Sequence, residues 1–180
     1  MINNRAKEFE LSPVGPAAKW FIALIAIMPL IVALTLWLKD PVSLTALPVW
    51  GFLLIAGAGP VLIALSLSGV RNPKALLGPD GLKIRVSFVN KVWPLSSLDS
   101  KAAQTVNLDL EDGLKPRWKL FGAAMPGLKS GLFKLKNGAR AHIYVTDTQK
   151  VVYIPSDKGV ILLSMQSPAS FLEHLQKLKC

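Results

Sequence analysis

Few side chains in this 180-residue sequence belong to the types that perform catalysis or hold metal ions. The two histidines, His142 and His174, have no companion at the spacing of a metal site, so we expect structural or solvated roles for both. Asp109, Glu111 and Asp112 form an acidic cluster at a predicted strand end and turn. Because Asp109 and Glu111 share a strand face that Asp112 does not, the cluster is more typical of a solvated turn than of a metal site.

The sequence also lacks the loop motifs that mark the active sites of common enzyme classes. The segment from Gly127 to Gly131 carries its serine one position too late for the nucleophile elbow of hydrolases. The glycines at positions 57 and 59 lie inside an apolar run and form neither a phosphate-binding nor a dinucleotide-binding loop. The single cysteine, Cys180, excludes an internal disulfide and a cysteine-based zinc site. We therefore expect a protein that is not an enzyme and that uses neither a metal ion nor a cofactor.

Basic residues dominate the chain after position 70. Residues 71–180 hold seventeen Lys or Arg and eight Asp or Glu, a net charge of +9. Seven of these basic residues lie between Asp112 and Asp147 with no acid among them. They form either a solvated strand face or a surface for anionic headgroups, where each contributes about 1 kcal/mol. The candidate lipid-binding or partner-binding residues are Lys83, Arg85, Lys115, Arg117, Lys119, Lys129, Lys134, Lys136 and Arg140.

Nucleic-acid binding is a third use for such a basic stretch, but two observations disfavour it. The only large aromatic residue that alternates with charge near the Asn137-Gly138 turn is Phe133, which suits a core better than a base-stacking surface. The chain also holds long apolar runs that would tether it to a membrane. We expect no nucleic-acid partner.

Two apolar runs precede the basic region. Residues 20–38 are uncharged between Lys19 and Lys39, and residues 41–70 are uncharged after Asp40. Each run is long enough for a transmembrane helix, which needs about 20 apolar residues. The sequence predicts a transmembrane hairpin with helices at about 20–38 and 46–68. Core helices of a soluble protein and a cleaved signal peptide are disfavoured, the latter because its apolar region is shorter and ends at small residues.

The distribution of Lys and Arg around these runs predicts the orientation. Basic residues precede the first run and follow the second, whereas only Lys39 lies between them. Cytoplasmic flanks carry the excess of positive charge. We expect a multi-pass protein of the bacterial inner membrane with both termini in the cytoplasm, and a flexible arm at residues 1–19.

Residues 71–180 show strand periodicity and then helical periodicity. Apolar and basic residues alternate over 82–89, and Asn137-Gly138 favours a two-residue type I′ hairpin. Residues 150–154 and 160–164 predict one more hairpin, and Ser167-Pro168 begins a C-terminal amphipathic helix. Seven or eight short antiparallel strands and one helix indicate a small β-barrel or bent sandwich with the helix over an open end. The expected fold is a membrane-anchored α+β protein.

The order of strands and three segments resemble bacterial pleckstrin-homology-like (PH-like) domains. The segments are GLFKLKNGARA at 131–141, IYVTD at 143–147 and the ending at 164–175. The resemblance covers about residues 75–178 and implies the fold, with 71–180 as the domain. Members of this group are often attached to membrane helix pairs, and relatives bind lipid headgroups, peptides or proteins. Lys83, Arg85 and Lys91 match the basic first hairpin of phosphoinositide-binding relatives only loosely.

These features together predict a non-enzymatic inner-membrane protein that presents a PH-like domain to a protein partner or to anionic lipid headgroups. The alternative is an accessory subunit of a larger membrane enzyme or transporter, with the specificity in the helix pair. A membrane-bound hydrolase is a third hypothesis, which would need His142 beside an acid and a hydroxyl group. The partner is expected to be a membrane or cytoplasmic protein, and a homo-oligomer is left open.

Overall fold

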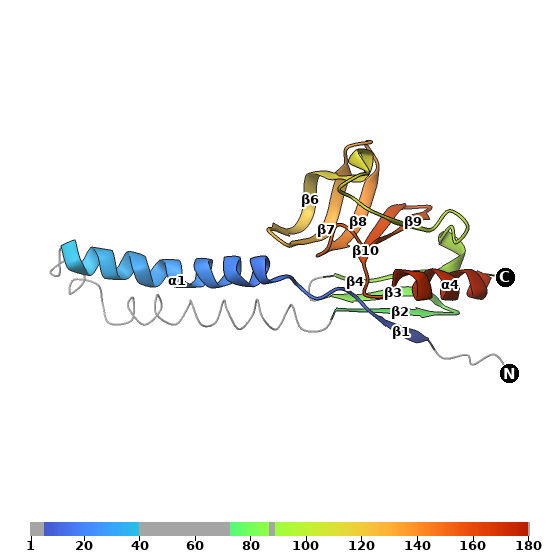
Figure 1. Cartoon of the computed structure of the whole chain (residues 1–180), viewed down its shortest axis with the longest axis horizontal. Coiled ribbons are helices and arrows are strands. Elements are labelled where there is room, and N and C mark those ends of the chain that lie inside the picture. The colour runs from blue at the N-terminus through green and yellow to red at the C-terminus, as the bar shows by residue number, and fades with distance from the viewer. Residues whose placement is uncertain (1–5, 40–72, 87–88, 180) are drawn as a thin grey trace.

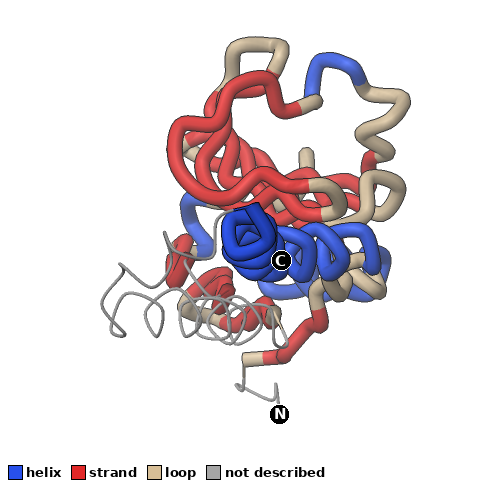
Figure 2. The backbone as a smooth tube through the Cα atoms, turned by 90° about the vertical axis from the view of Figure 1, so that its left-hand side faces the viewer, coloured by secondary structure: helices blue, strands red, loops and turns tan. Residues whose placement is uncertain are grey.

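The computed structural model describes residues 6–39, 73–86 and 89–179. A long helix extends from a domain built of two β-sheets and a C-terminal helix (Figure 1). Viewed almost along the long helix, one sheet lies above it and the other below it (Figure 2).

The first sheet is antiparallel and four-stranded, in the order β1-β2-β3-β4. The second is six-stranded, in the order β5-β9-β10-β8-β7-β6. Neither sheet closes on itself, so the alternative of a barrel is wrong and the PH-like architecture is an open pair of sheets with a helix. The strands are β1 (Lys7–Glu10), β2 (Lys74–Gly78), β3 (Gly81–Val86), β4 (Val89–Trp93), β5 (Gln104–Val106), β6 (Pro116–Met125), β7 (Leu128–Leu135), β8 (Arg140–Val145), β9 (Val151–Ser156) and β10 (Gly159–Ser164).

The predicted hairpin of β9 and β10 is confirmed, but β10 then pairs parallel to β8. The expectation of purely antiparallel strands is therefore wrong. The residues of β10 from Val160 to Leu163 are all apolar and all buried. A strand that is buried on both faces typically has a continuous run of apolar residues. The apolar run of β10 is therefore consistent with its place inside the six-stranded sheet.

Residues 7–10 form a strand, so the expectation of a flexible arm at residues 1–19 is wrong for its described part. Strand β1 pairs antiparallel with β2, and Glu10 lies opposite Lys74. The cause is an alternation that continues past the strand, because Phe9 and Leu11 are buried between charged or polar neighbours. The Phe9 ring packs edge-on against Phe171 at 5.2 Å between centroids.

Two apolar clusters form the core. The larger one lies between the two sheets and the C-terminal helix α4 (Pro168–Lys179), which buries Phe171 and Leu175. The smaller one lies on the opposite face of the six-stranded sheet. It is covered by the segment between β5 and β6, which contributes Leu108 and Leu114 and includes the 3₁₀ turn η2 (Asp112–Leu114). A second 3₁₀ turn, η1 (Leu95–Ser97), follows β4. The predicted C-terminal helix is confirmed.

Helix α1 (Pro16–Lys39) contains the first apolar run, so the predicted helix is confirmed there and begins four residues earlier than expected. Proline at the first helical position is favourable, because the amide that it lacks would have no intrahelical acceptor. Among the described residues, no helix meets both the length and the hydropathy expected of a membrane span. The predicted second helix at about 46–68 lies outside the described residues. The transmembrane pair stays a prediction.

The Asn137-Gly138 turn joins β7 to β8 as predicted, but the turn type differs. The Leu135 amide donates to the Ala139 carbonyl at 2.8 Å, and the Gly138 amide donates to the Leu135 carbonyl at 3.0 Å. This pattern is a three-residue loop that ends in a glycine at positive φ, rather than the two-residue type I′ turn. Gly138 has φ +88°, and the Asn137 side chain accepts the Ala139 amide at 3.0 Å.

Candidate functional site

The candidate basic residues fall into three groups. Lys83 and Arg85 lie on β3, on the face of the four-stranded sheet that points away from buried Leu82 and Ile84. A second group flanks η2, and a third lies on the neighbouring strands β6, β7 and β8. The nine residues therefore do not form one surface. The second group is Lys115 and Lys136, and the third is Arg117, Lys119, Lys129, Lys134 and Arg140.

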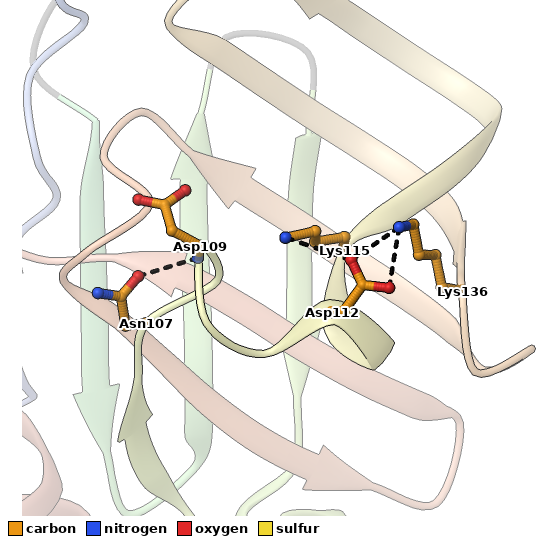
Figure 3. A network of polar contacts seen from close by, with 5 residues as sticks. All are labelled: Asn107, Asp109, Asp112, Lys115 and Lys136. Carbon is orange, nitrogen blue, oxygen red and sulfur yellow. Dashed lines mark hydrogen bonds and ion pairs between the residues drawn. The ribbon is translucent and has the colours of Figure 1, made fainter.

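Asp112 forms ion pairs with both lysines of the second group (Figure 3). Its carboxylate accepts a hydrogen bond from Lys136 Nζ at 2.7 Å and lies 3.2 Å from Lys115 Nζ. The hydrogen bond from Lys136, followed by that from Lys115, lowers the pKa of Asp112 below its ordinary value. The prediction of seven uncompensated charges is therefore wrong, because the acid at the boundary of the segment folds back onto two of them.

Asp109 also has a local role. It accepts a hydrogen bond from Thr148 Oγ1 at 2.9 Å. Its amide donates to Asn107 Oδ1 at 2.9 Å (Figure 3). Among the described residues, no three His, Cys, Asp or Glu side chains converge in a way that could hold a metal ion.

The third group lies on adjacent strands whose register determines which side chains share a face. Lys134 lies opposite both Trp118 on β6 and Arg140 on β8. Paired residues project from the same face, so these three side chains form one row across the sheet. Lys119 lies opposite buried Phe133 and belongs to the other face. Lys134 and Arg140 therefore share a face, whereas Asp112 holds Lys136 at the turn.

Strand β6 exposes large apolar side chains between its basic residues. The exposed fractions are 62% for Trp118, 52% for Leu120 and 69% for Phe121. We call residues 117–121 the β6 patch; it consists of Arg117, Trp118, Lys119, Leu120 and Phe121, and it covers both faces of the edge strand because Lys119 projects opposite to Trp118. Trp118 and Leu120 alternate along the sequence as residues of an apolar core face would, yet both are exposed. The cause is two register shifts, between residues 116 and 118 and between 119 and 121, which break the simple alternation.

The sequence contains the signal for this patch, because the run Arg-Trp-Lys-Leu-Phe places basic and large apolar residues side by side. Trp118, Leu120 and Phe121 were not among the candidate residues. Their exposure also depends on the place of β6 at the edge of the six-stranded sheet, where no further strand covers it among the described residues.

The turn that follows β6 lies close to the base of α1. The turn that follows β6 approaches the first turn of the helix (Figure 1), and a Cβ atom at Gly127 would lie 3.4 Å from the Ala18 nitrogen. Ala18 is fully buried in this contact region, whereas Trp20, two residues further along the helix, is exposed. The end of β6 therefore lies beside the start of the apolar helix, whereas the β6 patch lies in the first half of the strand.

Comparisons with curated proteins and with solved structures gave no significant match. The family described as "Bacterial PH domain" matches residues 74–179, which is more than half of the chain and includes every described strand except β1. The chain belongs to the bacterial PH domain family.

Proposed function

We propose that this protein is a membrane-associated binding protein whose PH domain docks on an anionic lipid surface through the β6 patch. The single observation that carries the proposal is the run of five exposed residues on β6, in which two aromatic rings and a leucine alternate with two cations. Monomeric domains seldom leave contiguous large apolar side chains in water unless the surface has a partner.

The chemistry of the patch fits the boundary between lipid headgroups and acyl chains. Tryptophan and other amphipathic aromatic residues favour this region. Arg117 and Lys119 add about 1 kcal/mol each on an anionic surface. The row of Trp118, Lys134 and Arg140 continues the same combination across three strands.

Helix α1 supplies a reason for the domain to be near lipid. It is uncharged between Lys19 and Lys39, and its exposed side chains include Leu24, Met28 and Leu38. A helix that is apolar around its circumference suits a lipid environment or a large core. We infer that the apolar side chains of α1 contact lipid acyl chains.

The pairing of β1 with β2 constrains the topology. One strand precedes α1 and the other follows residue 73, yet both belong to one sheet. The N-terminal tail and the PH domain must therefore lie on the same side of any bilayer. This supports the proposal that both lie on the cytoplasmic side of a bacterial inner membrane, as the distribution of Lys and Arg indicates.

The test uses the full-length chain in nanodiscs, with an environment-sensitive dye on one cysteine in a Cys180→Ser background. Leu120→Cys places the dye in the β6 patch and keeps both aromatic rings, whereas Gln176→Cys places it on the exposed face of α4 as a control. We expect the dye at 120 to shift to the blue and to be quenched by lipid-borne quenchers in anionic discs. The dye at 176 should behave as in water.

Charge variants complete the test. Arg117→Gln with Lys119→Gln should weaken docking of the domain about tenfold or more, seen as loss of quenching at 120. Lys101→Gln with Lys150→Gln removes the same charge from other exposed positions and should leave the quenching unchanged. Equal quenching in neutral and anionic discs, or a dye at 120 that stays in water, would show that the patch does not dock on anionic lipid.

A further inference from the structure

A second basic cluster lies where β4 of the four-stranded sheet meets β8 of the six-stranded sheet. Lys91 Nζ lies 2.6 Å from His142 Nε2. Both groups contact Trp93: Lys91 Nζ lies 5.2 Å from the centre of the indole, and the His142 ring meets it edge-on at 5.3 Å. These residues come from strands 51 positions apart in the sequence, so sequence patterns did not bring them together.

The indole nitrogen of Trp93 has no hydrogen-bond partner in the described part of the chain, although Trp93 is 2% exposed. A buried donor without a partner is rare and costs about 1–3 kcal/mol. Trp93 lines a small cavity of about 20 Å³ together with His142 and the two hydroxyl-bearing residues Ser130 and Tyr144. This volume accommodates one water molecule or one oxygen atom of a ligand.

The charges around this cavity have one sign. Loss of solvent lowers the pKa of Lys91, and repulsion by Lys158 lowers it further. Loss of solvent also lowers the pKa of His142, with a further contribution from Lys91. Arg140 lies two residues from His142 on the same face of β8, and Lys134 lies opposite Arg140. In the described residues, none of Lys91, Lys134, Arg140 and Lys158 forms an ion pair with a carboxylate.

This cluster contrasts with the one at η2, where Asp112 forms ion pairs with two lysines. One group of cations therefore has an internal counterion, whereas the other has none among the described residues. A bound anion would reverse both pKa shifts, because it would stabilise the ammonium and imidazolium forms. A single carboxylate would leave most of the positive charge unbalanced, whereas a phosphate carries up to two charges and accepts several hydrogen bonds.

We propose that the cluster of Lys91, His142, Trp93, Lys158 and Arg140 binds a phosphate group. The Lys91 ammonium and the imidazolium of His142 donate hydrogen bonds to the phosphate oxygens. Lys158 and Arg140 balance the remaining charge, and one oxygen is oriented toward the cavity that Trp93 lines. The phosphate is either free inorganic phosphate or the monoester headgroup of a lipid; only the lipid source rests on the proposed docking of the β6 patch.

The register makes a lipid source geometrically reasonable. His142 lies opposite Leu132, and Leu132 lies opposite Phe121 of the β6 patch. One row across three strands thus joins the phosphate cluster to the proposed membrane contact. A lipid whose headgroup occupied the cluster would have its apolar part on the side of Phe121.

The first experiment titrates the full-length chain with inorganic phosphate and follows the indole NMR signal of Trp93, assigned with Trp93→Phe. We expect a saturable shift of this signal and a higher pKa of the His142 ring. Lys91→Gln should weaken the apparent affinity about tenfold or more, since it removes a charged donor. Lys101→Gln removes one positive charge at a distant position and should not change the apparent affinity for phosphate. Absence of a saturable shift indicates that free phosphate is not the ligand.

The second experiment replaces free phosphate with nanodiscs. Discs with phosphatidic acid carry a phosphate monoester, and discs with phosphatidylglycerol carry a diester of similar surface charge. A larger Trp93 shift with phosphatidic acid identifies the lipid headgroup as the ligand. If the Trp93 shift is equal with the two kinds of disc and the titration with inorganic phosphate saturates, free phosphate is the ligand. If the shift is equal and that titration does not saturate, the proposal is overturned.

The two proposals can fail separately. Arg117→Gln with Lys119→Gln should abolish quenching of the dye at 120 and leave the inorganic phosphate titration unchanged. If Lys91→Gln has no effect on a saturable phosphate titration, the phosphate binds elsewhere and the assigned site is wrong.

Discussion

Strands β10 and β6 belong to the same sheet and use their apolar residues in opposite ways. The four residues from Val160 to Leu163 on β10 are all buried, and each face of the strand packs against a different core cluster. On β6, five consecutive residues are exposed and three of them are large and apolar. Apolar side chains inside the sheet thus contribute to stability, whereas those at its edge are free to contribute to binding.

The most direct test of this difference between β10 and β6 is to truncate one apolar side chain on each strand. Leu162→Ala should lower the free energy of unfolding by about 2–5 kcal/mol, because Leu162 is fully buried in the smaller cluster. Phe121→Ala should change it by about 0.5 kcal/mol or less, because the ring is mostly in water. Denaturant unfolding of the full-length variants measures both. Similar losses would mean that the Phe121 ring packs in the folded core.

The attachment of β6 to the sheet provides a second comparison, between two glycines. Gly131 on β7 lies opposite Gly122 on β6, and a Cβ at Gly131 would lie 2.1 Å from the Phe121 carbonyl oxygen. Gly138 also has positive φ, but a Cβ there would meet nothing within 4 Å. We expect Gly138→Ala to cost about 1 kcal/mol from backbone strain alone, and Gly131→Ala to cost clearly more.

Hydrogen exchange of the β6 amides distinguishes the two glycine variants. Gly131→Ala should increase exchange along β6 and leave β10 protected, since only the edge strand has to move. Unchanged exchange in β6 would show that the sheet absorbs the added methyl group without separating these strands.

The smallest expected effect concerns Asp112. Because its pKa is lowered in the folded state, its ion pairs stabilise the fold above the pKa of the unfolded chain, and this contribution is lost as the pH falls through the folded value. Asp112→Asn should therefore flatten the decrease in stability below about pH 4. The carboxylate is exposed, so the change at neutral pH should be slight. Thermal melts at several pH values measure the slope, with Asp99→Asn as a control that has no ion pair.

Asp112→Asn also sharpens the comparison of the basic clusters. It frees Lys115 and Lys136, so the domain should bind anionic discs at least as strongly as the parent, by the quenching assay at position 120. A weaker association would mean that the Asp112 network shapes the binding surface rather than only neutralising it.

Local periodicity was sufficient for the elements whose partners are near in sequence. The β9 and β10 hairpin and the helix after Ser167 were predicted from local patterns, and the apolar helix α1 was predicted from the length of its uncharged run. Local periodicity was not sufficient to predict pairings between distant segments. Strand β1 pairs with a strand more than sixty residues away, and β8 lies beside β10 rather than only beside β7. No short pattern in a sequence specifies such neighbours.

The candidate site was predictable in charge but not in shape. The basic residues of β6, β7 and β8 were identified by composition, yet the register shifts that expose Trp118 and Phe121 leave no signature in an alternating pattern. Asp112 was treated as the boundary of the basic stretch, although the turn at η2 brings it to Lys136. His142 was expected to be structural or solvated because it has no companion at the spacing of a metal site, and its contact Lys91 is 51 residues away in the sequence.

The pairing of Glu10 with Lys74 has a consequence for biosynthesis. During translation, β1 leaves the ribosome long before its partner β2 exists, and the apolar runs emerge in between. The four-stranded sheet can be completed only if both flanks of these runs end in the same compartment. A chain inserted with its flanks on opposite sides would leave β2 with an open edge and Phe171 without Phe9. If the chain is inserted in a membrane as proposed, this sheet can close only in the correct topology, and a fragment that begins at residue 74 would lack β1.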